Sequence, residues 1–426
     1  MTLKILILSQ DGDGLGIAQK LAKEGNQVKM YTKDPRFREV GSGMLEPVDS
    51  WRPNISWADM IICDMVGFGK HEELFRSRGK VVFGCNSIMD MAELDRKKGI
   101  ELFERFSIPT PETYSFDSPD DAQSISALWE DPGFVIKPSG NTDTSKTYVC
   151  HNPDIYKWAL ENIPPTSKLI VQKIVTGVEV STEGWFNGRD WIKPFNHTFE
   201  EKRLFDGDKG PNTGCMGNLV ISTEGDKLVE STVKKLTPFL KQINYRGPVD
   251  INCIIDGDSI YALEFTARLG YDAIEALAEG MQGKETLTDL FFETASGIKK
   301  EIAITKDYMI AVRLSVPPWP HADPDKGDKG MPIIGLIEDN MKHIFLTDVY
   351  KVGEDYLYAA GDGVIMKVTA RGRTIQEARS RVYRTIDNLT IQDVQYRNDI
   401  GVRAEQGIKK LKQWGWLGDS KVDSNA

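Results

Sequence analysis

Cysteine and histidine are both rare in this chain. The 426 residues include five histidines and five cysteines, which are Cys63, Cys85, Cys150, Cys215 and Cys253. The cysteines are odd in number, widely scattered and free of any C-x-x-C motif, and no paired histidine spacing accompanies them. This pattern argues against a disulfide framework and gives no indication of a zinc site.

Long apolar runs and an excess of positive charge are also missing. The chain starts MTLKILILSQDGDG, whose apolar run is too short for a signal peptide, and no stretch approaches a membrane span. Lysine and arginine number 53 against 63 aspartate and glutamate residues, giving a net charge of −10 and a pI near 5.3. This balance argues against non-specific nucleic-acid binding. We expect a cytoplasmic protein with neither nucleic acid nor membrane as a partner.

Two familiar nucleotide-binding motifs are absent. The P-loop pattern G-x-x-x-x-G-K-[ST] occurs nowhere in the chain. Gly12, Gly14 and Gly16 form G-x-G-x-G, so the third glycine comes one position too early for a dinucleotide fingerprint. A turn from strand to helix nevertheless suits an anion. A plain tight turn and a small-ligand site are equally open here, and NAD binding is not favoured.

The composition that remains is that of a soluble globular protein, 40% hydrophobic and 27% charged, long enough for two or three domains. Apolar segments at 4–9, 28–32, 60–65 and 80–84 alternate with helical patterns at 16–25 and 70–79. Such alternation predicts a doubly wound parallel α/β domain over residues 1–92.

The rest of the chain divides into two further predicted regions. Residues 93–304 mix strands and helices, including a helix expected at 228–243 despite its internal proline, and a small subdomain at about 117–180. Residues 305–418 combine a Pro/Gly-rich loop, strands and a helix that starts at a capping box, Thr374 to Glu377. The tail, 419–426, is expected to be disordered.

One polar loop, within FVIKPSGNTDTSKTYV (134–149), lies between two predicted strands. Lys137 ends the first strand, and Gly140 and Lys146 lie in the loop. Such a hairpin can fold over phosphates with its amides and ammonium groups. On this segment alone, however, a solvated hairpin with incidental lysines is the simpler interpretation.

A second hairpin carries carboxylates, in VDINCIIDGDSIYALEFTARLG (249–270). Asp250 starts one strand, Glu264 lies on the returning strand and Arg268 follows it. In an antiparallel pair the two carboxylates can approach each other. Converging oxygen ligands near a phosphate are typical of magnesium sites. An ordinary charge pair between Glu264 and Arg268 is as good an explanation.

The stretch GPNTGCMG (210–217) follows a charged run and cannot bury apolar surface. Its glycines give the backbone unusual freedom, so the stretch is either a surface loop or a loop whose amides hold a ligand.

Taken in order, these segments and V-Q-K-x-V-x-G-x-E at 171–179 resemble the ATP-grasp fold. More specifically, the chain is similar to the glycinamide ribonucleotide synthetase (phosphoribosylamine–glycine ligase) family, whose signature loop is GPNTGGMG. The similarity runs nearly from end to end, to DGVIMKVTARGRTIQEARSRVY and QYRNDIGVRA. It implies an N-terminal parallel α/β domain, an ATP-grasp domain and a C-terminal mixed β domain.

The resemblance also implies an activity and a set of site residues. Family members use ATP and magnesium, with manganese possible, to form an acyl phosphate on an amino acid that a phosphorylated amine then attacks. Such an enzyme acts on small molecules as a monomer or homodimer. The implied nucleotide contacts are Lys137, Gly140 and Lys146 for the phosphates, Gln172 and Lys173 for adenine, and Glu179 for the ribose. The implied metal residues are Glu264, Asp250 and Thr266. Arg268, Asp206 and Asp208 are implied in catalysis, and Gly12, Gly14, Asn212, Thr213 and Gly214 in substrate binding.

Several positions depart from the family pattern. Thr266 stands where a metal-ligating asparagine is usual, and Cys215 replaces a glycine of the signature loop. In the first domain, DGDGLGIAQKL stands in place of G-G-R-E-H-A-L. These departures keep two alternatives open beside the family reaction: the same chemistry on a different amine, or a catalytically silent nucleotide-binding descendant.

Overall fold

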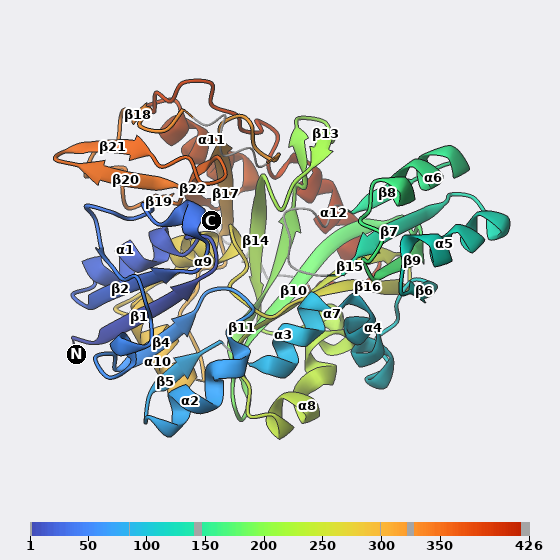
Figure 1. Ribbon diagram of the computed structural model, residues 1–426, viewed down its shortest axis with the longest axis horizontal. Coiled ribbons are helices and arrows are strands. Elements are labelled where there is room, and N and C mark those ends of the chain that lie inside the picture. Colours follow the sequence, from blue (N-terminus) through green and yellow to red (C-terminus); the bar gives the residue numbers. More distant parts are fainter. Residues whose placement is uncertain (1, 85, 140–146, 299, 322–327, 419–426) are drawn as a thin grey trace, which may run out of the picture.

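The computed structural model describes residues 2–84, 86–139, 147–298, 300–321 and 328–418. Three large sheets and two small ones organise this part of the chain (Figure 1). Gly140, Lys146 and the predicted disordered tail lie outside the described residues. Among the described helices, none is long and apolar enough to cross a membrane.

The N-terminal region forms the predicted parallel sheet. Its strands follow the order β3-β2-β1-β4-β5, and every pairing is parallel. The strands are β1 (Lys4–Ser9), β2 (Gln27–Thr32), β3 (Glu46–Pro47), β4 (Met60–Cys63) and β5 (Val81–Phe83), with helices α1 (Leu15–Lys23) and α2 (Glu72–Ser77). Helices α3 (Ser87–Leu94) and α4 (Arg96–Arg105) then lead away from this sheet. Residues 10–14 form the turn between the carboxyl end of β1 and the start of α1.

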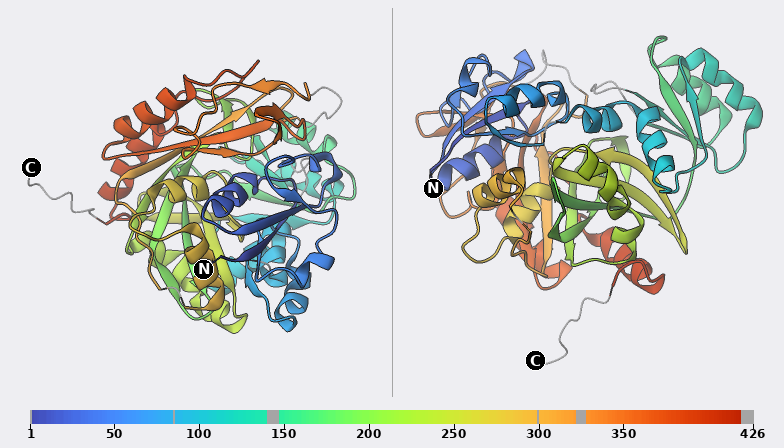
Figure 2. Two further views of the ribbon diagram at one scale, coloured as in Figure 1. Left: turned by 90° about the vertical axis from the view of Figure 1, so that its left-hand side faces the viewer. Right: turned by 90° about the horizontal axis from the view of Figure 1, so that it is seen from below.

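A small antiparallel sheet, which we call the lid sheet, stands at one end of the molecule, away from the N-terminal domain (Figure 1 and Figure 2). Its order is β6-β9-β7-β8, and it has an apolar cluster of its own. The elements are β6 (Thr113–Phe116), β7 (Phe134–Pro138), β8 (Tyr148–Cys150) and β9 (Leu169–Lys173), with α5 (Pro119–Ala122) and α6 (Pro153–Glu161). Ser118 caps α5 by accepting from the Asp121 N–H, as its sequence predicts.

The central sheet has eight strands in the order β16-β15-β10-β11-β14-β17-β22-β19, all paired antiparallel. They are β10 (Val178–Asn187), β11 (Trp191–Glu200), β14 (Gly217–Thr223), β15 (Arg246–Asp256), β16 (Ser259–Thr266), β17 (Tyr308–Ser315), β19 (Ile344–Leu346) and β22 (Val364–Gly372). The last three come from the predicted C-terminal region, so this sheet continues across residue 304. A hairpin of β12 (Arg203–Phe205) and β13 (Lys209–Asn212) and a sheet of β18 (Pro332–Ile333), β21 (Asp355–Tyr358) and β20 (Val349–Val352) complete the strands.

Helices pack on both faces of the central sheet. One face carries Thr182 and His197 and meets α7 (Lys227–Ser231), where His197 Nε2 lies 2.8 Å from Asp226. Near the same face are α8 (Thr237–Gln242) and α12 (Val402–Gln413). The other face meets α9 (Ala273–Gly280) and α10 (Leu287–Ser296), while α11 (Ile375–Ile386) packs beside β17 and β22.

The prediction of a single helix at 228–243 is wrong. The segment breaks into α7, a short 3-10 turn over Val233–Leu236, and α8. Thr232 leaves the helical region, with φ −121° and ψ −105°, and Pro238 lies in the first turn of α8. Proline has no N–H to donate and clashes with the preceding turn, so it begins a new helix here.

Candidate active site

The register of the central sheet gathers polar side chains on one face. Asp250 on β15 is opposite Thr266 on β16, and Asn252 is opposite Glu264. Opposed residues point to the same side of a sheet. The nearest cross-strand neighbour of Glu264 is thus an asparagine, while Asp250 lies diagonally from it. On the next strand, β10, Glu183 is opposite Asp250.

Cations converge on Glu264. Arg96 Nη1 lies 2.7 Å from one carboxylate oxygen, and Lys202 Nζ lies 3.5 Å from the other. Lys202 also lies 2.9 Å from Glu179. Burial by itself raises the pKa of Glu264, but the charges of Lys202 and Arg96 overcome it and hold that pKa well below its usual range. Glu264 is therefore ionised at neutral pH.

Lys137 lies at the end of β7 in the lid sheet and reaches the same cluster. Its Nζ donates to the Leu263 carbonyl at 3.3 Å, and the residue is buried. Burial lowers its pKa to about 8, against the opposing charge of Glu264. Lys137, Arg96 and Lys202 thus place three cationic groups around one carboxylate, where a polyphosphate can share them.

The two residues predicted to contact adenine, Gln172 and Lys173, both lie on β9, and their side chains have different surroundings. Gln172 is buried, donates to Thr113 Oγ1 at 3.0 Å, and has an Oε1 atom without a partner among the described residues. Lys173 lies 2.7 Å from Glu112 and 2.9 Å from Glu130. Lys173 is therefore engaged by two carboxylates of the lid region.

The glycine-rich loop is hydrogen-bonded to the backbone of Lys202, one residue of the cation cluster. Thr213 donates to the Lys202 carbonyl through its N–H at 2.7 Å and its hydroxyl at 2.9 Å. Asn212 Nδ2 donates to the Thr147 carbonyl of the lid region at 3.4 Å. A Cβ built on Gly214 meets no atom within 4 Å, so the backbone there is open to a ligand. These contacts join the loop to both sides of the site.

Asp206 and Asp208, predicted to be catalytic, contact the 397–403 segment instead of the cation cluster. Asp206 accepts from the Asn398 N–H at 2.8 Å, and Asp208 pairs with Arg397 at 3.2 Å and with Arg403. These contacts fasten the β12–β13 hairpin, from which the glycine loop extends, to the C-terminal region. A catalytic role for the two aspartates stays a prediction.

Arg268 follows β16 and is fixed by Glu93 of α3. Its Nε donates to Glu93 Oε1 at 3.0 Å, and Glu93 also accepts from the Ala267 N–H at 2.7 Å. Burial opposes the charge on Arg268, but Glu93 more than compensates and raises its pKa. The alternative of an ordinary Arg268–Glu264 charge pair is not found, because Glu264 pairs with Arg96 and Arg268 pairs with Glu93.

The turn with Gly12 and Gly14 follows β1 of the N-terminal sheet and contacts Asp64, which is hydrogen-bonded to the residue after Arg268. Gly12 has φ +86°, which favours glycine, and its N–H donates to Ser9 Oγ at 3.0 Å. A Cβ on Gly14 would lie 2.4 Å from Asp64 Oδ2, so only glycine allows the turn to pass this carboxylate. Asp64 in turn accepts from the Leu269 N–H at 3.3 Å through its carbonyl.

The chemistry of the polar face fits a magnesium ion. Asp250 is buried, and burial together with the charges of Glu183 and Glu200 raises its pKa well above the usual range. Asn252 Oδ1 is buried without a donor among the described residues. Within those residues, no group of three or more His, Cys, Asp or Glu could hold a metal ion by itself. Magnesium needs only one or two carboxylates when phosphate oxygens complete its shell.

Three residues of this site escaped the sequence analysis: Arg96, Lys202 and Glu93. Each lies in a charged stretch, ELDRKK or FEEKRLF, which reads as a solvated surface. Lys202 is distant in sequence from Glu179 and Glu264, and only the fold brings the three together. The one local signal for Lys202 was its place in the charged run FEEKRLFDGDK, which directly precedes the glycine loop.

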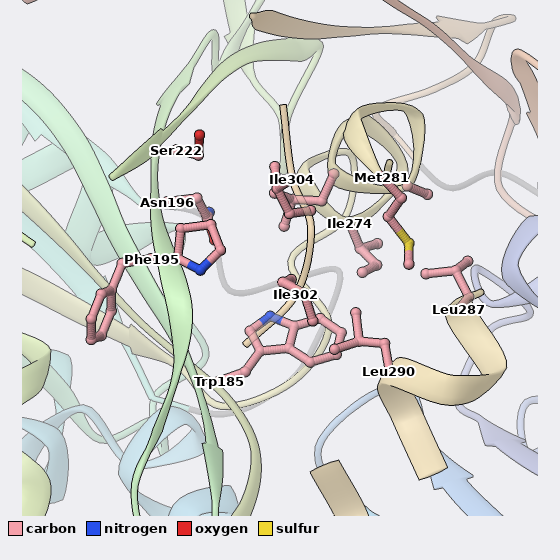
Figure 3. A pocket seen from close by; sticks show the side chains of 13 residues that line it. Trp185, Phe195, Asn196, Ser222, Ile274, Met281, Leu287, Leu290, Ile302 and Ile304 are labelled. Carbon is pink, nitrogen blue, oxygen red and sulfur yellow. The ribbon is translucent and has the colours of Figure 1, made fainter. Parts of the chain in front are cut away.

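An apolar pocket lies further along the same face of the sheet, beneath α9 and α10. Figure 3 shows Trp185, Ile274, Met281 and Leu290 around it. Asn196 and Ser222 add polar atoms, and no charged side chain belongs to its described lining. This pocket therefore lacks the converging charges that the cation cluster around Glu264 provides.

Two family models match the chain. Phosphoribosylglycinamide synthetase, ATP-grasp (A) domain, matches residues 97–273, and the C domain of the same enzyme matches residues 321–403. Phosphoribosylamine–glycine ligase of Clostridium acetobutylicum is 24% identical over 94% of this chain and 99% of its own length. The ligase of Thermotoga maritima is also 24% identical, with the same coverage.

Solved structures agree in fold. The crystal structure of the Thermotoga maritima ligase has a TM-score of 0.73 at 21% identity and covers 93% of this chain and 100% of its own. The biotin carboxylase of Campylobacter jejuni, in its β,γ-ATP complex, has a TM-score of 0.65 at 13% identity, covering 96% of this chain and 97% of its own. Two family models in the right order, full-length relatives and a shared fold lead to one conclusion: the chain belongs to the phosphoribosylglycinamide synthetase family of ADP-forming ATP-grasp ligases.

Proposed function

We propose that this chain joins glycine to 5-phosphoribosylamine, at the expense of ATP, to form glycinamide ribonucleotide in purine synthesis. The γ-phosphoryl group passes to a glycine carboxylate oxygen and ADP leaves. The amine then attacks the acyl carbon, the bond from that carbon to the phosphate oxygen breaks, and phosphate and a proton are released. The observation that carries the proposal is the cation cluster around Glu264, in a chain of this family.

Lys137, Arg96 and Lys202 are the groups we assign to the ATP phosphates. Each of the three cations is already held by a partner in the protein. Arg96 and Lys202 pair with Glu264, and Lys137 donates to the Leu263 carbonyl. The cationic groups are therefore oriented before a polyphosphate binds. Preorganised charges stabilise a transferring phosphoryl group without a cost of reorganisation during the reaction.

Glu264 is the residue we assign to magnesium, with Asp250 and Thr266 beside it on the same face. A magnesium ion held by these residues would supply positive charge that neutralises the phosphate oxygens. Glu264 suits this role because its low pKa keeps it ionised. Glu179 remains our assignment for the ribose, and its contact with Lys202 ties it to the phosphate groups.

The glycine loop and Arg268 are the parts we assign to the carboxylate and the amine. Asn212, Thr213 and Gly214 are assigned together, because the backbone at Gly214 is open and Thr213 donates to the Lys202 carbonyl. Arg268 is oriented by Glu93, and a guanidinium is well shaped for an acyl phosphate or a carboxylate. Gly12 and Gly14 belong to the N-terminal turn that packs against Asp64, whose carbonyl accepts from the Leu269 N–H next to Arg268. The chain would act in the cytoplasm, as a monomer or homodimer.

The deciding experiment measures phosphate release from ATP and magnesium with glycine and freshly generated 5-phosphoribosylamine, omitting each component in turn. Release that requires both substrates supports the proposed reaction. Release with glycine and some other amine would keep the ligase chemistry and replace the acceptor. ATP binding without release for any acid–amine pair would overturn the proposal.

A further inference from the structure

Asn252 has one side-chain atom to which no described residue donates a hydrogen bond. The residue lies on β15 and is 4% exposed. Its Nδ2 group donates to Glu179 Oε1 at 3.0 Å, whereas the buried Oδ1 atom has no partner among the described residues. An ionised carboxylate can only accept, so the bond to Glu179 fixes which end of the amide is the oxygen. A buried acceptor without a donor is costly, and a ligand at Oδ1 would remove that cost.

The cation that contacts the same oxygen of Glu179 is already shared among carboxylates. Lys202 Nζ lies 2.9 Å from Glu179 Oε1 and 3.5 Å from both Glu200 and Glu264. Its three donors therefore have charged acceptors around them, which an ammonium group prefers to a neutral amide oxygen. The described part of the chain thus surrounds Asn252 with acceptors and supplies Oδ1 with neither a donor nor a cation.

The register of the central sheet places Asn252 directly across from Glu264. Their strands, β15 and β16, lie side by side, with β10 on the other side of β15 (Figure 1). The register shifts directly after this pair and leaves Leu263 as the extra residue of a β-bulge, whose carbonyl accepts from Lys137. Bulges re-aim side chains and are common beside active sites. Opposed residues have Cβ atoms about 4.5–5.5 Å apart, so the oxygens of Asn252 and Glu264 can reach one small ligand.

Two oxygens of this kind suit a divalent cation. A carboxylate oxygen and an amide oxygen are hard ligands of the type that magnesium binds, and neither oxygen can donate to a phosphate. Arg96 and Lys202, which contact Glu264, are the cations that we assign to the ATP phosphates. Phosphate oxygens compete for these two cations, which leaves the oxygens of Glu264 to a metal ion.

We infer that Asn252, through Oδ1, holds the magnesium ion together with Glu264, and that Asn252 rather than Thr266 is the second protein ligand. Thr266 lies across from Asp250, one pair further along the two strands. Glu179 is then a positioning residue, because its bond to Nδ2 orients the amide and keeps Oδ1 available. The inference rests on the proposed function, because it requires a magnesium ion between this face of the sheet and the ATP phosphates.

The test measures Mn²⁺ binding to the complex of the full chain with ADP, through the electron paramagnetic resonance signal of free Mn²⁺. Asn252→Leu keeps the size of the side chain but removes the oxygen, and it should weaken Mn²⁺ binding about tenfold or more. Asn252→Asp keeps an oxygen ligand and should bind Mn²⁺ at least as tightly as the wild type. Asn196→Leu is the matched control, because it removes another buried amide from the same face of the sheet, in the apolar pocket, and should leave the Mn²⁺ affinity unchanged.

An unchanged Mn²⁺ affinity in Asn252→Leu would overturn the inference. If ADP binding in EDTA weakened in that variant while the Mn²⁺ affinity stayed the same, Oδ1 would instead serve a hydroxyl of the nucleotide.

Cysteine variants give a second, independent readout, which also applies if Asn252→Leu does not fold. A thiolate is a soft ligand, so Asn252→Cys should lose affinity for Mn²⁺ and gain affinity for Cd²⁺ relative to the wild type, whereas Thr266→Cys should change neither. The reverse pattern would give the ligand role to Thr266. If the wild-type ADP complex binds no Mn²⁺, the metal assignment of the proposed function fails, whereas equal binding by the wild type and the Asn252 variants contradicts the role of Asn252 alone.

Discussion

Replacement of Arg397 by methionine is expected to loosen the hairpin that carries the glycine loop. The guanidinium is 2% exposed and contacts Asp399 at 2.7 Å, Asp208 at 3.2 Å and Glu201 at 3.3 Å. It also donates to the Arg203 carbonyl at 3.1 Å, at the first residue of β12. One side chain thus links the start of the hairpin to the C-terminal segment.

The expected decrease in the free energy of unfolding follows from the burial of Glu201, which is 3% exposed. Without Arg397, its remaining cation is the half-exposed Arg403 at 2.9 Å. Removing one partner of a buried ion pair costs up to about 3–5 kcal/mol when the other charge is left without compensation, and here the half-exposed Arg403 compensates Glu201 only in part. Arg381 pairs with Glu377 at the surface, where such a pair contributes less than about 1 kcal/mol, so Arg381→Met is the matched control.

The decrease in the free energy of unfolding caused by Arg397→Met should also depend on pH. Burial raises the pKa of Glu201 from its ordinary 4.5 to about 7, even with both arginines present. Removing Arg397 raises it further, so the ionised form is penalised in the folded state above this pKa and the penalty fades as the residue protonates. The destabilisation should therefore be larger near pH 8 than near pH 5.5.

Urea unfolding of the three proteins at both pH values measures these differences directly. A loss below about 1 kcal/mol for Arg397→Met, equal to that of the control, would refute the reasoning, because it would mean that Glu201 is solvated. Weaker glycine binding at a temperature where Arg397→Met is still folded would show that the hairpin contacts position the glycine loop.

Three further predictions concern the ATP site. Glu264→Gln should reduce kcat by about a hundredfold or more while the protein still folds, and normal turnover over a magnesium titration would disprove our metal assignment. Lys137→Met should raise the KM of ATP by roughly tenfold, with Lys137→Arg restoring most of it, because the charge rather than the length of the side chain serves the phosphates. Chelation should abolish activity, and added magnesium or manganese should restore it; activity that persists in EDTA would contradict a metal-assisted reaction.

Much of the fold could be predicted from local sequence. The apolar segments at 4–9 and 28–32 become β1 and β2, because runs flanked by helical patterns are typical of buried parallel strands. Thr374 caps α11 by accepting from the Glu377 N–H, although Glu377 itself accepts from Arg373 and so leaves the capping box incomplete. The failure at 228–243 came from periodicity that continued across a proline.

The sequence by itself determined the types of element, the family and the set of motif residues, since these depend on neighbours in the chain. Tertiary structure alone decided which partners the charged residues take. Arg268 binds Glu93 rather than Glu264, and Lys202 joins Glu179 to Glu264. It also brought the DGDG turn over Asp64, about fifty residues away in the chain. Coulomb energies and desolvation depend on distance and burial, which only the folded chain fixes.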